Sequence, residues 1–150
     1  MSVHLEIVED LYFLVDMNEI SWKRIQKEEN IIVQSEIPEQ VQLKERKRGR
    51  KAVRMLKAKE VSSFEALKLY LEERGLNPAG AMEMFGLLSL HDPKAILQGR
   101  DVVHLLAPDT VQYGKNILMA TVQMQWTQVG RGNIPYGNYD EYYRIICIEN

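Results

Sequence analysis

The chain contains one cysteine, Cys147, so it cannot close an internal disulfide bond. This excludes a disulfide-stabilised secreted scaffold and a zinc site built from several cysteines. Cys147 lies among the apolar residues of the stretch IICIE, where a thiol behaves as a small hydrophobic side chain. The opening stretch, MSVHLEIVEDLYFLVDM, has no basic region of the kind that begins a signal peptide. We therefore expect a cytoplasmic protein.

Long hydrophobic runs are also absent. No apolar stretch approaches the ~20 residues that a helix needs to cross a bilayer, so no membrane partner is predicted. The remaining composition is ordinary for a globular protein, with 45% hydrophobic and 27% charged residues among 150. This length predicts a single domain, residues 1–150, which buries roughly two thirds of its unfolded surface.

Residue patterns that support catalysis or metal binding are scarce. His4, His91 and His104 are far apart, and none has a second histidine three or four positions away, so no metal site is predicted. The chain has no G-x-S-x-G sequence, and Cys147 falls within a predicted strand, away from any helix N-terminus that would lower its pKa. We predict a non-enzymatic protein with no catalytic residue and no cofactor.

Carboxylates on separate strands leave one enzymatic alternative open. Acidic residues that are distant in sequence can meet in three dimensions and hold a divalent metal ion. A metal-dependent nuclease would draw on Glu6, Glu9, Asp10, Asp140 and Glu141.

Positive charge is scarce over most of the chain and concentrated in one segment. Residues 44–59, KERKRGRKAVRMLKAK, hold nine of the nineteen lysines and arginines and one acid, a net charge of +8. The remainder holds ten basic and twenty acidic residues, a net charge of −10. The total of −2 therefore conceals a strongly dipolar distribution.

The basic segment, residues 44–59, changes character along its length. Its first half has no apolar periodicity and contains Gly49, which destabilises a helix by roughly 1 kcal/mol relative to alanine. An apolar stripe with Val53 and Leu56 begins at Ala52. We expect a mobile basic arm that becomes helical near residue 50 and projects from the body of the protein.

Such a segment predicts binding to the phosphates of a nucleic acid, because lysine and arginine displace the counterions that condense on a phosphate backbone. The predicted nucleic-acid-binding residues are Arg46, Lys47, Arg48, Arg50, Lys51, Arg54 and Lys57. The pattern does not distinguish DNA from RNA and does not give an oligomeric state. Two alternatives remain: the segment docks on an acidic surface of a partner protein, as in an adaptor or inhibitor, or it is a solvated face neutralised by the chain's own acids.

A second candidate region is residues 130–138, GRGNIPYGN, interpreted as a glycine-rich hairpin loop. Tyrosine and asparagine suit adaptable recognition, and four of the seven tyrosines lie between positions 136 and 143. The predicted loop contacts are Arg131, Tyr136 and Tyr139. No helix follows the first glycines, so this is not a phosphate-binding loop of the kind that opens a helix. The alternative is an ordinary hairpin connection.

The overall pattern predicts an α+β fold, with an antiparallel sheet of about three to four strands and two to three helices, residues 62–98, on one face. Alternating apolar positions place the strands at residues 3–15, 30–37, 116–129 and 139–148, the last two paired as a hairpin. A short helix is predicted at residues 19–29.

The helices of residues 62–98 are predicted from their end signals. Ser62 and Glu65 form a capping box, and Gly75 ends the first helix in a left-handed conformation. Asn77 and Pro78 open a second helix. Asp92 and Pro93 open a third, which ends at Gly99.

Overall fold

The computed structural model describes residues 4–6, 12–34, 49–60, 63–110, 116–133 and 142–149. Within these ranges the strands are β1 (His4–Glu6), β2 (Tyr12–Asp16), β3 (Ile31–Val33), β4 (Arg50–Glu60), β5 (Leu76–Pro78), β6 (Val103–Ala107), β7 (Asn116–Val122), β8 (Thr127–Asn133) and β9 (Tyr143–Glu149). The helices are α1 (Trp22–Gln26), α3 (Phe64–Glu73), α4 (Ala81–Leu90) and α5 (Pro93–Leu97), with 3-10 turns η1 (Met17–Glu19) and η2 (Pro108–Thr110).

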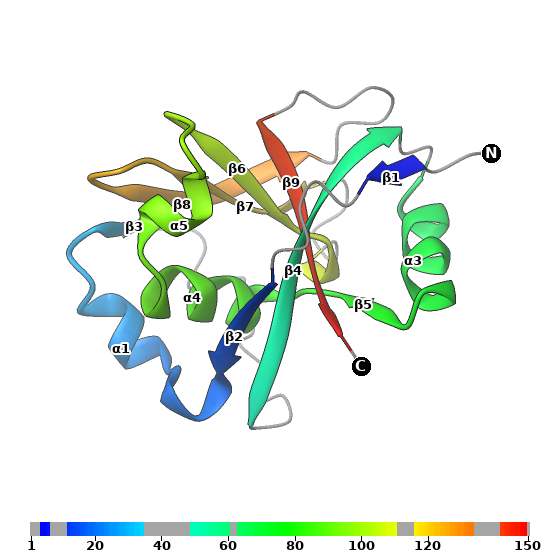
Figure 1. Ribbon diagram of the computed structural model, residues 1–150. Helices are drawn as coiled ribbons and strands as arrows, with labels where there is room; N and C mark the ends of the chain where they lie inside the picture. The colour runs from blue at the N-terminus through cyan, green and yellow to red at the C-terminus, as the bar shows by residue number, and fades with distance from the viewer. Residues whose placement is uncertain are drawn as a thin grey trace.

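The strands are joined in one mixed sheet of order β1-β4-β9-β6-β7-β8-β3, in which β2 also pairs with β4 and β5 pairs with β9 (Figure 1). Most pairs are antiparallel, but β6 with β9 and β3 with β8 are parallel. The α+β class is confirmed. The predicted antiparallel sheet of three to four strands was wrong, because strand pairs between distant segments add members that no local pattern revealed.

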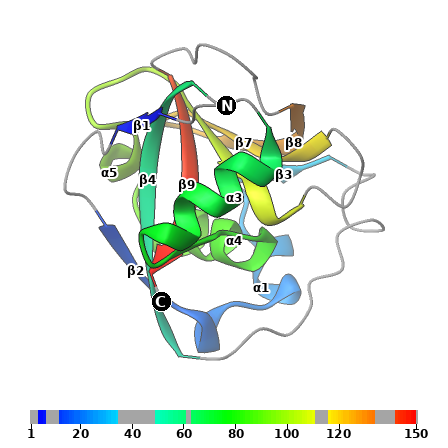
Figure 2. The ribbon, with the colours of Figure 1, turned by 90° about the vertical axis from the view of Figure 1, so that its right-hand side faces the viewer.

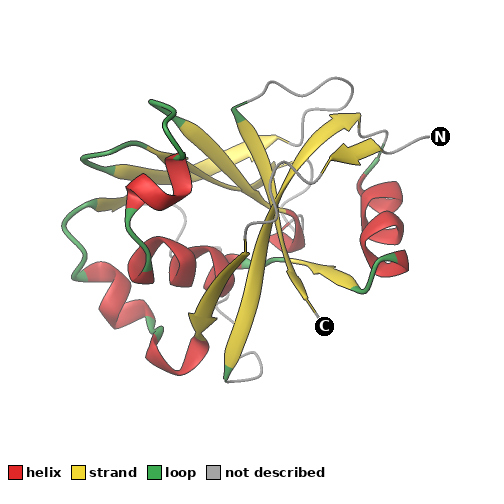
Figure 3. Cartoon of the chain, in the orientation of Figure 1, coloured by secondary structure: helices red, strands yellow, loops and turns green. Residues whose placement is uncertain are grey.

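The central strands of the sheet bury both of their faces. Successive residues of β9 alternate between two apolar cores: Ile146 and Ile148 pack with α4, and Ile145 and Cys147 pack with α3. We call these sides the α4 face and the α3 face. In Figure 1, α3 lies to the right of β4 and β9 and α4 to the left, and in Figure 2 α3 is nearer the viewer. Figure 3 shows the strands between these helices.

The prediction that all helices of residues 62–98 cover one face was therefore wrong. The cause lies at Leu76–Pro78, which form β5 and pair with β9. The chain crosses here from the α3 face to the α4 face, where Asn77 and Pro78 were predicted to open a helix. Helix α4 instead begins at Ala81, after Gly80 in the N-cap position.

Other helix ends follow the sequence closely. Ser63, one residue after the predicted cap, accepts a hydrogen bond from the Ala66 amide at 3.1 Å. Gly75 has a φ of +72° and follows the end of α3, as predicted. Asp92 accepts a hydrogen bond from the Lys94 amide at 2.8 Å, which confirms the predicted start of α5.

Residues 50–60 form β4, so the helix predicted near residue 50 was wrong. The strand has partners on both sides, β2 and β1 along one edge and β9 along the other. Val53 and Met55 enter the α4 core, while Leu56 enters the α3 core. Hydrogen bonds to three neighbours and burial on two faces outweigh the helical spacing of a few apolar residues.

The predicted strand 116–129 is divided by a turn. β7 ends at Val122, and Met124 and Trp126 lie in the turn with exposed fractions of 56% and 39%. The predicted hairpin of residues 116–129 with 139–148 was wrong as well, because β7 pairs with β6 and β8, and β9 pairs with β4, β5 and β6.

The first four residues of the predicted loop 130–138 belong to β8, and the rest lie outside the described residues. Glycine fits this strand for a steric reason. A Cβ on Gly130 would lie 2.5 Å from Gln34 Cδ, and one on Gly132 would lie 2.8 Å from Met119 Cβ. Because these glycines have no side chain, the side chains of Gln34 and Met119 pack closely against the backbone of β8.

No helix in the described ranges has both the length and the apolar composition of a membrane span.

Candidate functional site

The basic residues that the structure describes divide between the two sides of β4. Lys51 and Lys57 share the side of Val53, which faces α4, whereas Arg50 and Arg54 share the side of Leu56, on the α3 face. Arg46, Lys47 and Arg48 lie outside the described residues. The strand thus separates charges that the sequence presents as one run.

Arg54 of β4 contacts one residue on each of the two neighbouring strands. Its guanidinium is ion-paired with the Glu149 carboxylate of β9. Its central carbon is 5.8 Å from the centre of the Tyr12 ring, in the cross-strand position on β2. Only 21% of the Arg54 side chain is exposed. The charge of Arg54 is therefore partly neutralised by Glu149, an acid of the same chain, which is one of the alternatives considered for the basic segment.

Cys147 is the β9 residue opposite Arg54, and it is fully buried in the α3 core. Burial raises the pKa of the Cys147 thiol to about 12, while the Arg54 guanidinium lowers it and the Glu149 carboxylate adds to the rise. The thiol therefore stays protonated at neutral pH and is no nucleophile.

An open patch lies beside Arg54 on the α3 face of β2 and β4. Tyr12 and Leu14 each have an exposed fraction of 53%, and Leu14 lies opposite the small residue Ala52. Arg50 is exposed two residues further along the same side of β4. We call Tyr12, Leu14, Arg50, Ala52 and Arg54 the β2–β4 platform.

Three other basic residues of β4 form no ion pair within the described part of the chain. These residues are Arg50, Lys51 and Lys57. In the register of the sheet, Arg50 lies opposite Asp16 of β2 and Lys57 lies opposite Glu6 of β1, and Lys51 lies opposite Val15.

Sequence reasoning predicted Arg50 and Arg54 of this platform. It missed Tyr12, Leu14 and Ala52, together with Glu149, the ion-pair partner of Arg54. Tyr12 falls between the apolar positions of the predicted strand 3–15, and its 53% exposure agrees with that alternation. An aromatic ring on the polar side of an amphipathic strand is the signal that would have marked it. Glu149 had no such signal, because 95 positions separate it from Arg54.

The one predicted loop contact that the structure describes, Arg131, lies away from the β2–β4 platform. Arg131 lies in β8 opposite Leu118, and its side chain is exposed. Three strands separate β8 from β4, a distance of about 19 Å at the usual ~4.8 Å between neighbouring strands. Tyr136 and Tyr139 lie outside the described residues.

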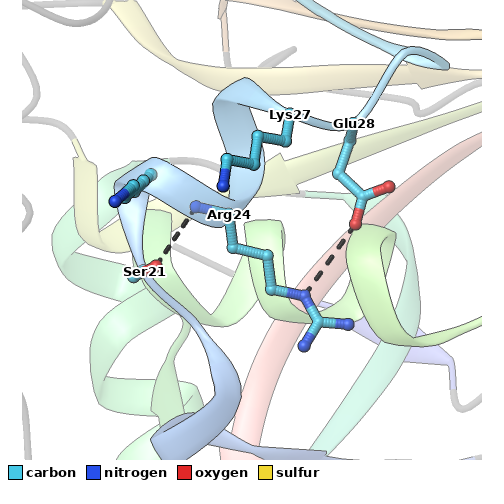
Figure 4. A pocket seen from close by; sticks show the side chains of 5 residues that line it. Ser21, Arg24, Lys27 and Glu28 are labelled. Atoms are coloured by element: carbon cyan, nitrogen blue, oxygen red, sulfur yellow. Dashed lines mark hydrogen bonds and ion pairs between the residues drawn. The ribbon is translucent and has the colours of Figure 1, made fainter.

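A shallow pocket of about 520 Å³ lies over α1 (Figure 4), lined by Ser21, Lys23, Arg24, Lys27 and Glu28. The Arg24 Nε donates a hydrogen bond to Ser89 Oγ at 3.1 Å, and Ser89 Oγ donates to Glu28 Oε1 at 2.7 Å. Arg24 and Glu28 also form an ion pair at 3.9 Å. These contacts attach α1 to the last turn of α4, so the Arg24 charge serves a structural role.

A polar row crosses the α3 face on four adjacent strands. His104 of β6 stacks on Tyr143 of β9, with ring centres 4.7 Å apart, and its Nδ1 is 3.1 Å from Thr121 Oγ1 of β7. Gln128 of β8 is the cross-strand neighbour of Thr121. These half-buried side chains link the central strands to one another.

Within the described ranges, no three histidine, cysteine or acidic side chains are grouped so as to hold a metal ion. Of the carboxylates considered for a nuclease, Glu6 belongs to β1, and Glu9, Asp10, Asp140 and Glu141 lie outside the described residues. That alternative stays a prediction.

No protein-family model matches the chain, and it matches no curated protein and no solved structure.

Proposed function

We propose that the protein binds a nucleic acid by its phosphate backbone, through β4 and the basic residues that precede it. The observation that carries this proposal is that Arg50, Lys51 and Lys57 form no ion pair with another described residue, although Arg50 and Lys57 lie opposite Asp16 and Glu6. They continue the basic run of residues 44–59, which has a net charge of +8 in an otherwise acidic chain. A backbone of phosphates is the polyanion that such a segment attracts most strongly.

An extended strand suits this role. On each side of a strand, alternate residues are spaced by about 6.6 Å, so like charges are kept apart and each reaches its own phosphate. Arg50 and Arg54 are four residues apart on one side, about 13 Å at ~3.3 Å per residue. Arginine adds a planar fork that donates two parallel hydrogen bonds to one phosphate.

The proposal is tested by fluorescence anisotropy with labelled DNA and RNA over a series of salt concentrations. If about five phosphates are neutralised, the logarithm of the affinity for duplex DNA falls against the logarithm of the salt concentration with a slope of about −4 to −5. Arg50→Gln should flatten this slope by about one, because Arg50 is exposed on the α3 face of β4. Lys51 and Lys57 lie on the opposite side of the strand, so Lys51→Gln and Lys57→Gln report whether the nucleic acid also contacts the α4 face.

Lys68→Gln is the matched control, because Lys68 is an exposed lysine on α3, outside the basic segment. It should leave the slope unchanged. An affinity that does not change between low and moderate salt would contradict the proposal.

The platform also favours a second candidate function, docking on an acidic surface of a partner protein. Half-exposed Leu14 and Tyr12 beside Arg54 resemble the aromatic, apolar and arginine anchors of protein interfaces. Capture from a nuclease-treated lysate separates the two functions: a protein partner survives the digestion, whereas one bridged by nucleic acid is lost.

A further inference from the structure

We infer that the β2–β4 platform stacks an unpaired base, so that the nucleic acid bound is single-stranded. This inference rests on the proposed function and specifies its substrate class. It depends on the surroundings of Tyr12, whose ring lies on the side of the sheet away from the α4 core and is 53% exposed. A base presents a flat π face, and a tyrosine ring on a sheet is a stacking surface for it.

Arg54 makes this surface rigid. The Glu149 carboxylate and the Tyr12 ring hold its guanidinium from two sides, and most of the side chain is covered. A tyrosine ring held in place loses little conformational freedom when a ligand arrives. Arg54 therefore positions Tyr12, and the Tyr12 ring is the exposed flat group of the platform.

The platform combines stacking with charge. Arg50 is exposed on the same side of β4, about 13 Å from Arg54 along the strand, where it can contact a phosphate next to the stacked base. Leu14 adds apolar area beside Tyr12. Proteins that bind single strands combine these features, a positive surface for the backbone and aromatic rings for the bases. In a duplex the flat faces of the bases are already stacked and paired, so Tyr12 could not reach them.

The edge of β2 is less suited than its face to receive a partner. The Leu14 carbonyl oxygen lies 2.8 Å from His91 Nε2, so this backbone acceptor is already engaged. A strand added from another chain would have to displace His91, whose ring also makes an edge contact with Phe13 at 5.0 Å. A ligand that lies on the face disturbs neither contact.

The experiment compares a fluorescently labelled single strand with the duplex of the same sequence, at one salt concentration, by anisotropy. The wild-type chain should bind the single strand more tightly. Tyr12→Leu should weaken single-strand binding by about 5- to 100-fold, the range expected for one lost base stack, and should change duplex binding less than about twofold. Tyr12→Phe keeps the ring and should bind as the wild type does.

Tyr70→Leu is the matched control. Tyr70 forms a second tyrosine–arginine pair, with the Arg74 guanidinium 3.3 Å from its ring centre, but it lies on helix α3. Its replacement should leave single-strand affinity unchanged. If Tyr12→Leu does not fold, photo-crosslinking of the wild-type chain to a single strand that contains 5-iodouracil decides, with the crosslink expected on Tyr12.

Three outcomes overturn the inference and are distinguishable. If both nucleic acids bind in a salt-dependent way and Tyr12→Leu changes neither affinity, the base stack is wrong while the proposed function stands. If neither nucleic acid binds, both are wrong. If Tyr12→Leu converts a dimer to a monomer in light scattering without changing nucleic-acid affinity, a second copy of the chain occupies the platform.

Discussion

Cys147 shows how neighbours determine what a side chain can do. A thiolate is a strong nucleophile, but here desolvation dominates, and the pKa is raised from 9.0 to about 12 even with Arg54 nearby. At pH 7.5 the thiolate is a negligible fraction of the folded protein.

We predict that Cys147 does not react with Ellman's reagent at pH 7.5 in the folded chain and reacts readily in guanidinium chloride, because unfolding exposes the thiol and restores its ordinary pKa. The measurement is the absorbance of the released chromophore at equal protein concentration, and the unfolded chain serves as the control. Labelling of the folded chain at the rate of the unfolded one would show that the thiol is accessible.

The raised pKa has a consequence for stability. Because the folded state holds the thiol proton more tightly, this contribution to stability is complete below pH 9.0 and is lost as the pH rises from about 9 toward about 12. Cys147→Ala lacks the titrating group. Its free energy of unfolding, measured by urea denaturation, should therefore fall less steeply than that of the wild type between about pH 8 and pH 10.5. Parallel slopes would contradict the assigned pKa.

The contact between α4 and β2 depends on a glycine inside a helix. A Cβ on Gly86 would lie 2.5 Å from Val15 Cγ1 and 3.2 Å from Ile20 Cγ1. Val15 is fully buried and β-branched, so it has little freedom to move aside. Gly86 therefore sets how closely α4 approaches the sheet.

Gly86→Ala should destabilise the fold by about 1–3 kcal/mol in urea denaturation, because overpacking exceeds the ~1 kcal/mol that alanine normally contributes in a helix. A double-mutant cycle supplies the control. In a Val15→Ala background the same substitution should be much less destabilising, because the clashing methyl group is gone. An equal penalty in both backgrounds would place the strain elsewhere.

Elements with local signals were predictable, and those defined by distant partners were not. The cap at Asp92 and the left-handed Gly75 were predicted from adjacent residues. β5 was not, because Asn77 and Pro78 are strand residues only through their pairing with β9. The same holds for β4, whose helical spacing was outweighed by its neighbours, and for β6 at Val103–Ala107, which was not predicted.

For the candidate site, the positions of the charges were predictable but their sides were not. A helix or a mobile arm would present Arg50, Lys51, Arg54 and Lys57 in one region, whereas the strand directs them to opposite faces. Whether an arginine is neutralised also depends on tertiary structure, as the partner of Arg54 shows.

Across the whole molecule, the protection of backbone amides from hydrogen exchange should depend on where each strand lies in the sheet. β9 and β6 have partners on both sides and bury both faces, whereas β3 has three residues and, among the described strands, pairs only with β8. Hydrogen exchange followed by mass spectrometry or NMR should find the slowest amides in β6 and β9 and the fastest strand amides in β3. Equal protection of β3 and β9 would mean that the edge is covered in solution.

The position of β9 also has a consequence for synthesis on the ribosome. β9 lies between β4 and β6 and pairs with β5, yet it is translated after all of them. At about 5–20 residues per second, the nascent chain spends several seconds with the central gap of its sheet unfilled. During that interval the strands that flank the gap are open to wrong pairing, so this chain should depend on holding chaperones more than one in which sheet neighbours follow each other in sequence.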